Sequence, residues 1–152
     1  MGNIAYITTR KHVKSYDMMS LLQDINQRRF DGKMTIRDHC EGWEISYQHW
    51  ENAWETIWIH PESTRKVGAK HPHSVWMPYV FVVFLEELGA LTNGVMSDEG
   101  VSERWKPNPK KYSSWDVWMK ILHARSLQTN PEAAEQFIKL ETSYVPNGME
   151  KY

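Results

Sequence analysis

Three of the chain's seven histidines lie in one short stretch, HPESTRKVGAKHPHS. They are His60, His71 and His73. Imidazole nitrogens are common zinc ligands, and Glu62 in the same stretch could supply a fourth donor. The spacing argues against a metal site, because neither a helical HExxH pattern nor paired cysteines accompany these residues. We therefore predict no metal and no cofactor, and we expect the stretch to be a solvated loop.

The same stretch is basic and precedes a predicted helix. Its cations are Arg65, Lys66 and Lys70, and Gly68 would let a ligand approach the backbone closely. Unpaired N–H groups and the dipole at a helix start attract anions. The spacing is neither GxxxxGK[ST] nor GxGxxG, so a specific nucleotide site is not indicated. The three cations form a candidate anion-binding site, with a plain connection between sheet and helix as the alternative.

Two further basic clusters bear on a nucleic-acid role. They are Arg10, Lys11, His12 and Lys14 near the N-terminus, and Lys106, Lys110 and Lys111 in a proline-rich connector. If all three clusters shared one side, they could bind RNA or single-stranded DNA, with Trp105 or Tyr112 as stacking platforms. The formal net charge is -1, so this role requires a local patch. The sequence does not place the clusters together.

Aromatic residues are unusually frequent, with eight tryptophans and seven tyrosines. Many gather in WEISYQHWENAWETIWI, where Trp54 and Trp58 share a face by the strand period of two. Packing in the core accounts for most of them. Tryptophan is also enriched at the centres of protein interfaces, so we predict that Trp50, with His49 beside it, and Trp54 bind a protein partner.

Catalysis has little support in the sequence. Cys40 follows Asp38 and His39, but neighbouring side chains on a strand point to opposite faces, so these three are not a ready triad. Glu86 and Glu87 are adjacent on a predicted helix, where neighbours diverge by about 100°, so they cannot share one substrate unaided. We assign no catalytic residue, and an enzyme is the less favoured class.

The hydrophobic pattern predicts the elements in chain order. Alternation indicates strands at residues 3–9, 34–37, 43–48 and 54–59, and the period of 3.6 indicates three to four helices. The first helix is expected to begin at an N-cap, Ser15, and to end at Gly32. A buried helix should begin near Met77, with Pro78 in its first turn, and close at residues 93–94. Another should follow the caps at residues 113–114, and a last one should begin near residue 130.

These elements predict an α+β fold, an antiparallel sheet of about four strands with three to four helices packed on one face. The length of 152 residues fits a single domain, with a loosely ordered tail from about residue 143. A single cysteine and the lack of a signal-peptide pattern predict a cytoplasmic protein. The longest apolar run, Val75 to Leu85, is too short to span a membrane, so no membrane partner is expected.

The opening block, NIAYITTRKHVKSYDMMSLLQDINQRRFDGKMTI, resembles the start of small accessory proteins encoded by T4-like bacteriophages. The resemblance covers about the first 36 residues and includes no catalytic motif. It implies a protein of the host cytoplasm that binds and redirects a host component. The leading hypothesis is therefore a non-enzymatic protein-interaction module that binds a host factor. The alternative is nucleic-acid or phosphate binding through the basic loops, and a metal- or phosphate-directed hydrolase is third.

Overall fold

The computed structural model describes most of the chain, in five segments and four single positions. They are residues 4–48, 54–71, 78–98, 101–111 and 113–122, and residues 132, 135, 136 and 139. Several predictions concern positions outside this part. They are those on His49, Trp50, His73 and Tyr112, on most of the last helix predicted from near residue 130, and on the tail from about residue 143.

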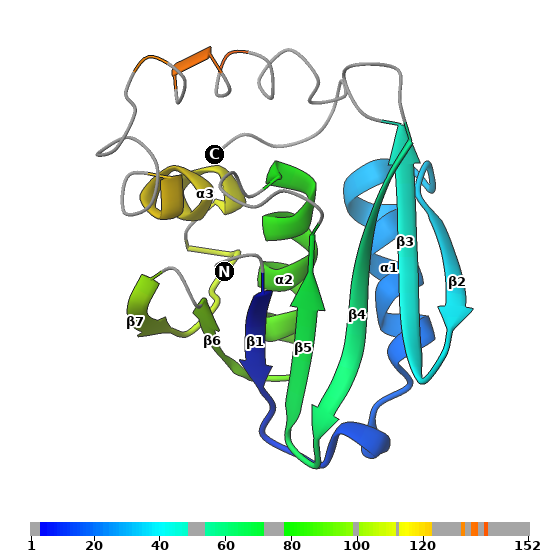
Figure 1. Cartoon of the computed structure of the whole chain (residues 1–152). Helices are drawn as coiled ribbons and strands as arrows, with labels where there is room; N and C mark the ends of the chain where they lie inside the picture. The colour runs from blue at the N-terminus through cyan, green and yellow to red at the C-terminus, as the bar shows by residue number, and fades with distance from the viewer. Residues whose placement is uncertain are drawn as a thin grey trace.

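One antiparallel sheet of seven strands, in the order β2-β3-β4-β5-β1-β6-β7, organises the molecule (Figure 1). The strands are β1 (Ile4–Thr8), β2 (Thr35–His39), β3 (Gly42–Gln48), β4 (Trp54–Ser63), β5 (Lys66–Lys70), β6 (Val95–Asp98) and β7 (Val101–Trp105). The α+β class and the single antiparallel sheet are confirmed, whereas the expected number of about four strands is too low. Every pairing is antiparallel.

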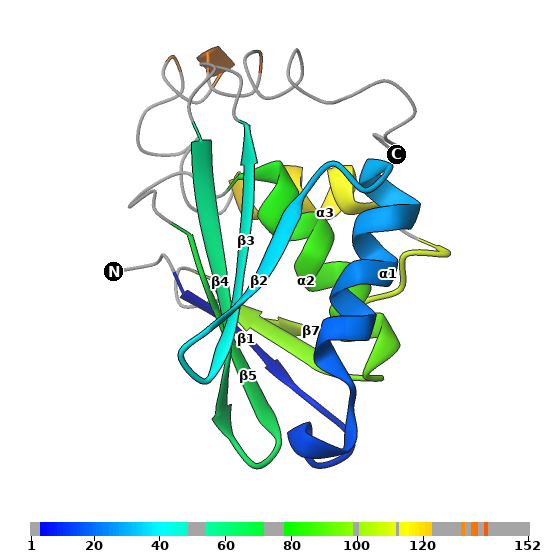
Figure 2. The same ribbon diagram turned by 90° about the vertical axis from the view of Figure 1, so that its right-hand side faces the viewer.

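Among the residues that the structure describes, the three longest helices all lie on one face of this sheet (Figure 2). Alternation along the strands explains the arrangement, because one set of side chains is apolar and buried while the other set is more polar. Ile7 on β1, Ile45 on β3 and Ile57 on β4 are fully buried on the helix side. The opposite face is turned away from the helices, and Figure 1 looks onto it.

The first helix, α1 (Met18–Phe30), follows a short 3-10 helix, η1 (Val13–Ser15). The cap is Asp17 instead of the predicted Ser15, because the Asp17 carboxylate accepts a hydrogen bond from the backbone N–H of Ser20. Asp31 and Gly32 end the helix with φ values of 53° and 72°. The left-handed backbone at the predicted Gly32 terminus is the region that glycine tolerates best.

The central helix, α2 (Tyr79–Leu91), is buried along nearly its whole length. Pro78 stands at its N-cap, as its missing N–H favours, and the N–H of Gly94 donates to the carbonyl of Gly89 at 2.8 Å to close it. On one side Phe84 stacks on Phe30 of α1, with ring centroids 5.2 Å apart. The helix begins at Tyr79, two residues after the predicted Met77, and Pro78 lies just before its first turn instead of within it. The predicted closure at Gly94 is confirmed.

The third helix, α3 (Ser114–Leu122), packs on α2. The hydroxyl of Ser113 accepts a hydrogen bond from the N–H of Asp116, which confirms one of the predicted caps. The Trp118 ring is fully buried and meets Tyr79 of α2 edge to face at 5.7 Å. No helix in the described residues is both long and apolar enough to cross a membrane.

The prediction of a loop from residue 60 is wrong, because β4 continues to Ser63 and a hairpin leads into β5. Pro61 can remain in β4 because the β3 pairing ends at Ile59, so Pro61 has a partner strand on one side only. The turn residues are Thr64 and Arg65, and a register shift lies just before them. Strands β6 and β7 were also not predicted.

Candidate anion-binding site

Two basic segments far apart in the sequence meet at one end of the sheet. The backbone N–H of Thr9 donates to the carbonyl of Arg65 at 2.8 Å, and the N–H of Val13 donates to the carbonyl of Thr64 at 2.7 Å. The connection between β1 and α1 therefore lies against the β4–β5 turn, at the bottom of Figure 1. We call the cations brought together here the basic end. They are Arg10, Lys11, Lys14, Arg65 and Lys66.

The backbone of the basic end is held in place by further hydrogen bonds. The buried Thr9 donates its hydroxyl to the carbonyl of Lys11 at 2.6 Å. The hydroxyl of Tyr16 accepts from the N–H of Lys11 at 3.3 Å and donates to the carbonyl of Thr92 at 3.1 Å. The segment is thus tied to the end of α2 as well as to the β4–β5 turn. A fixed backbone reduces the entropic cost of ordering its side chains around a ligand.

The charges of the basic end are available to an anion. Four of the five cations are exposed, and Lys66 is half-buried with its Nζ 4.8 Å from the centroid of the Tyr6 ring. In the described part of the chain, none of the five forms an ion pair with a carboxylate. The nearby carboxylates are already engaged, since Asp17 caps α1 and Glu62 contacts His60 at 2.9 Å.

The predicted trio of Arg65, Lys66 and Lys70 is divided between the two ends of β5. Lys66 pairs with Thr8 at the basic end, whereas Lys70 pairs with Ile4 at the other end of the strand. The prediction that the N-terminus of the following helix, α2, lies beside Arg65 and Lys66 is wrong. The N–H of Arg10 donates to the carbonyl of Thr92 at 3.4 Å, which places the C-terminal end of α2 beside the basic end.

The histidines of the stretch HPESTRKVGAKHPHS cannot all bind one metal ion. His60 lies on the open face of β4 and contacts Glu62, whereas His71 is buried on the helix side with its ring edge-on to Phe81 at 4.7 Å. The sheet therefore separates His60 from His71. Among the described residues, no group of three or more histidine, cysteine or acidic side chains is arranged to hold a metal ion.

The third basic cluster lies on the helix side of the sheet. Pro107, next to Lys106, packs against Gly89 of α2, so closely that a Cβ at Gly89 would come within 2.5 Å of the proline ring. Trp105 is not a free stacking platform, because its indole N–H donates to the carboxyl of Glu86 at 2.9 Å and the side chain is half-buried. The structure thus brings Arg65 and Lys66 together with the N-terminal cluster, and it leaves Lys70 and the third cluster apart from them.

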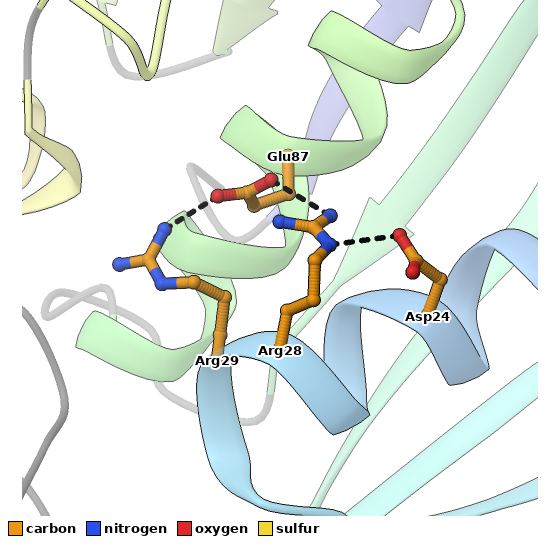
Figure 3. A network of polar contacts seen from close by, with 4 residues as sticks. All are labelled: Asp24, Arg28, Arg29 and Glu87. Carbon is orange, nitrogen blue, oxygen red and sulfur yellow. Dashed lines mark hydrogen bonds and ion pairs between the residues drawn. The ribbon is translucent and has the colours of Figure 1, made fainter.

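The two adjacent carboxylates of α2 point in different directions. Glu86 is buried and meets Trp105, and burial raises its pKa to about 7, with the charge of Glu87 adding to the effect and the bond from Trp105 opposing it. Glu87 accepts hydrogen bonds from Arg28 at 3.1 Å and Arg29 at 2.6 Å (Figure 3). Glu87 therefore joins α2 to α1, and the pair is not arranged for acid-base chemistry on one substrate.

Cys40 lies in the turn between β2 and β3, exposed and with a φ of 53°. Of the two residues before it, His39 lies 3.6 Å from the carboxylate of Glu44, and Asp38 pairs in register with Trp43. No arrangement of base and nucleophile is formed among these residues.

Of the three residues predicted to bind a protein partner, Trp54 is the one that lies in the described part of the chain. It is 67% exposed at the start of β4, on the open face and at the end of the strand away from the basic end. The sequence reasoning did not select Tyr6, which shares the open face and contacts Lys66. The alternation in NIAYITT placed Tyr6 opposite the buried Ala5 and Ile7, but nothing in the sequence indicated its contact with Lys66.

Comparison with known proteins adds no assignment to this geometry. The likeness to phage accessory proteins stays a prediction, and the function rests on the arrangement of the residues themselves. Neither a protein-family model, nor a curated protein, nor a solved structure matches the chain.

Proposed function

We propose that the protein is a non-enzymatic nucleic-acid-binding protein that holds phosphates at the basic end. The observation that supports this most is the pair of backbone hydrogen bonds from Thr9 and Val13 to the β4–β5 turn. They bring together five cations that the sequence separates by about fifty positions. Phosphate contacts from lysine and arginine supply most of the affinity of non-specific nucleic-acid binding.

The local charge suits a polyanion although the whole chain carries a net charge of -1. The five cations of the basic end face two nearby carboxylates, Asp17 and Glu62, which leaves an excess of three positive charges (five minus two). Both carboxylates are held by hydrogen bonds to other groups. A concentrated patch attracts phosphates at short range, where the screening by salt is weakest.

The test compares two double variants that remove the same charge. Lys14→Ala with Arg65→Ala alters exposed residues of the basic end, and Lys106→Ala with Lys110→Ala alters exposed residues of the helix side. We expect the first pair to weaken binding of a fluorescein-labelled 12-nucleotide strand by roughly tenfold or more at 50 mM salt, and the second to leave it within about twofold. Equal weakening by both pairs, or no binding by the wild type at low salt, would contradict the proposal.

A protein partner is the second candidate, and the exposure of Trp54 favours it. Large exposed aromatic side chains are frequent hot spots in interfaces. The resemblance to phage accessory proteins suggests a host component as that partner. The test is reconstitution of a purified, stoichiometric complex, which should weaken at least about tenfold in Trp54→Ala. An unchanged affinity would remove Trp54 from the interface.

A further inference from the structure

The open face of the sheet carries three ring side chains on β1 and β4, the two strands on either side of β5. Trp58 and His60 alternate with buried residues along β4, and Tyr6 alternates with buried residues along β1, so all three point away from the helices. Each is half-buried. Figure 1 looks onto this face, and the helices lie behind it.

The register sets the spacing of these rings. Tyr6 pairs with Gly68 of β5, and Gly68 pairs with His60 of β4, so Tyr6 and His60 stand two strand spacings apart, roughly 10 Å. Trp58 lies two residues from His60, roughly 7 Å along the strand. The lack of a side chain at Gly68 makes room for the His60 ring, because a Cβ there would lie 2.6 Å from its Nε2.

This spacing favours a ligand whose planar groups are not stacked on one another. Tyr6 and Trp58 are separated by both spacings, which gives a diagonal of roughly 12 Å. Bases in a duplex strand rise by about 3.4 Å and stay stacked on one another, so they cannot reach rings at this spacing. A single strand can splay its bases, and each base can then stack on one ring.

Cations flank the rings along the same face. Lys66 and Lys70 lie on one side of β5, about 13 Å apart, with Lys66 over Tyr6 and Lys70 opposite Trp58. Glu44 also lies in this row, opposite Trp58. Its carboxylate is contacted by Arg37 at 3.1 Å, which reduces its effect on a bound anion. Lysines interleaved with half-buried rings on an open face complement a strand of phosphates and bases.

We propose that single-stranded nucleic acid lies across the open face, with bases on Tyr6 and Trp58 and phosphates along Lys70 and Lys66 toward the basic end. This inference rests on the proposed function, because the basic end supplies the sequence-independent part of the affinity. It adds that the ligand is single-stranded and that the open face of the sheet contacts its bases. The backbone of the strand follows β5 because the two lysines of the face stand on that strand.

The experiment measures fluorescence anisotropy with labelled oligothymidine and oligouridine 12-mers, and with a duplex of equal length. The variants are Tyr6→Leu and Trp58→Leu, each paired with a ring-retaining control, Tyr6→Phe and Trp58→Phe. We expect each leucine variant to weaken single-strand binding by roughly tenfold, and each phenylalanine variant to stay within about threefold. The wild type should bind the single strands at least about tenfold more tightly than the duplex. Comparison of the two 12-mers shows whether DNA or RNA is preferred.

Two results separate this inference from the proposed function. Equal affinity for duplex and single strand, with weakening only in Lys14→Ala/Arg65→Ala, overturns the inference and keeps the proposed function. No binding of any oligonucleotide at low salt overturns both. If the face instead joins two copies of the chain, Trp58→Leu will convert a dimer into a monomer in light scattering without weakening nucleic-acid binding, and this also overturns the inference.

Folding of the variants is checked independently of binding. Each leucine variant is compared with its phenylalanine partner by circular dichroism and urea unfolding. If Trp58→Leu unfolds, Lys70→Gln serves as the second variant, since Lys70 is exposed and lies in the same row. Lys70→Gln should weaken single-strand binding by roughly fivefold or more at 50 mM salt. Unchanged binding in Lys70→Gln overturns the proposed path along β5.

Discussion

Glu86 is a buried acid in the middle of the helix layer, and replacing it tests the description of the core. Its side chain is buried, with the residue 1% exposed, and burial raises its pKa from the ordinary value of 4.5 to about 7. The difference of about 2.5 corresponds to about 3 kcal/mol at full ionisation. Because the pKa is higher in the folded state than in the unfolded chain, ionisation of Glu86 destabilises the folded state. This cost is absent well below pH 4.5, grows as the pH rises and is complete above about pH 7.

In Glu86→Gln the side chain no longer titrates, while its amide oxygen can still accept the hydrogen bond from Trp105. We expect the free energy of unfolding of the variant, relative to the wild type, to increase by about 2.5 kcal/mol between pH 5 and pH 8. Urea unfolding at several pH values in this range, followed by tryptophan fluorescence, measures this difference directly.

Glu135→Gln is the matched control, because Glu135 is exposed and the substitution removes the same charge. Its free energy of unfolding should stay within about 0.5 kcal/mol of the wild type at every pH. If the curves for Glu86→Gln and the wild type run parallel from pH 5 to pH 8, Glu86 does not titrate in this range and the reasoning is refuted.

Three further substitutions test the contacts that hold the helix layer, each by urea unfolding at pH 7. Glu87→Ala should cost about 3 kcal/mol because it leaves the largely buried guanidinium of Arg29 without its carboxylate, and a cost below about 1 kcal/mol would contradict a buried ion pair. Asp17→Ala should lower the free energy of unfolding by about 1 kcal/mol, because it removes the cap of α1. An equal loss in Ser15→Ala would contradict the assignment of the cap to Asp17. Asn26→Ala should lower the free energy of unfolding by at least about 2 kcal/mol, because the buried side-chain amide donates to the carbonyl of Met34 and accepts from its N–H. An unchanged free energy of unfolding would argue against those hydrogen bonds.

Much of the fold could be predicted where one local pattern dominates. Strict alternation located β1 to β4, and the apolar run with proline before it and Asn-Gly after it located α2. The hairpin into β5 was missed because Thr64-Arg65 is not an Asn-Gly type of turn, and because Pro61 argues against a strand. Strands β6 and β7 are short and carry polar residues such as Ser97. Their pairing, of β6 with β1 and of β7 with β6, therefore depends on neighbouring strands and not on their own propensity.

The candidate site was predictable only as separate pieces. The sequence shows that Arg10 and Lys14 are near one another, and so are Arg65 and Lys66, but only the pairing of β1 with β5 brings the two segments together. From the sequence, a protein partner was favoured because tryptophan is frequent in this chain and enriched among interface hot spots. The geometry favours the nucleic-acid alternative, since charge proximity across strands is a tertiary property that periodicity does not encode.

The salt dependence of binding tests the central claim most directly. The logarithm of the affinity for the oligothymidine 12-mer should fall linearly with the logarithm of salt concentration, and the slope measures how many phosphates the protein neutralises. We predict that Lys14→Ala with Arg65→Ala lowers the magnitude of this slope by about 1.4, roughly 0.7 for each phosphate that is no longer neutralised. A slope equal to that of the wild type, or binding that does not depend on salt, would contradict phosphate recognition at the basic end.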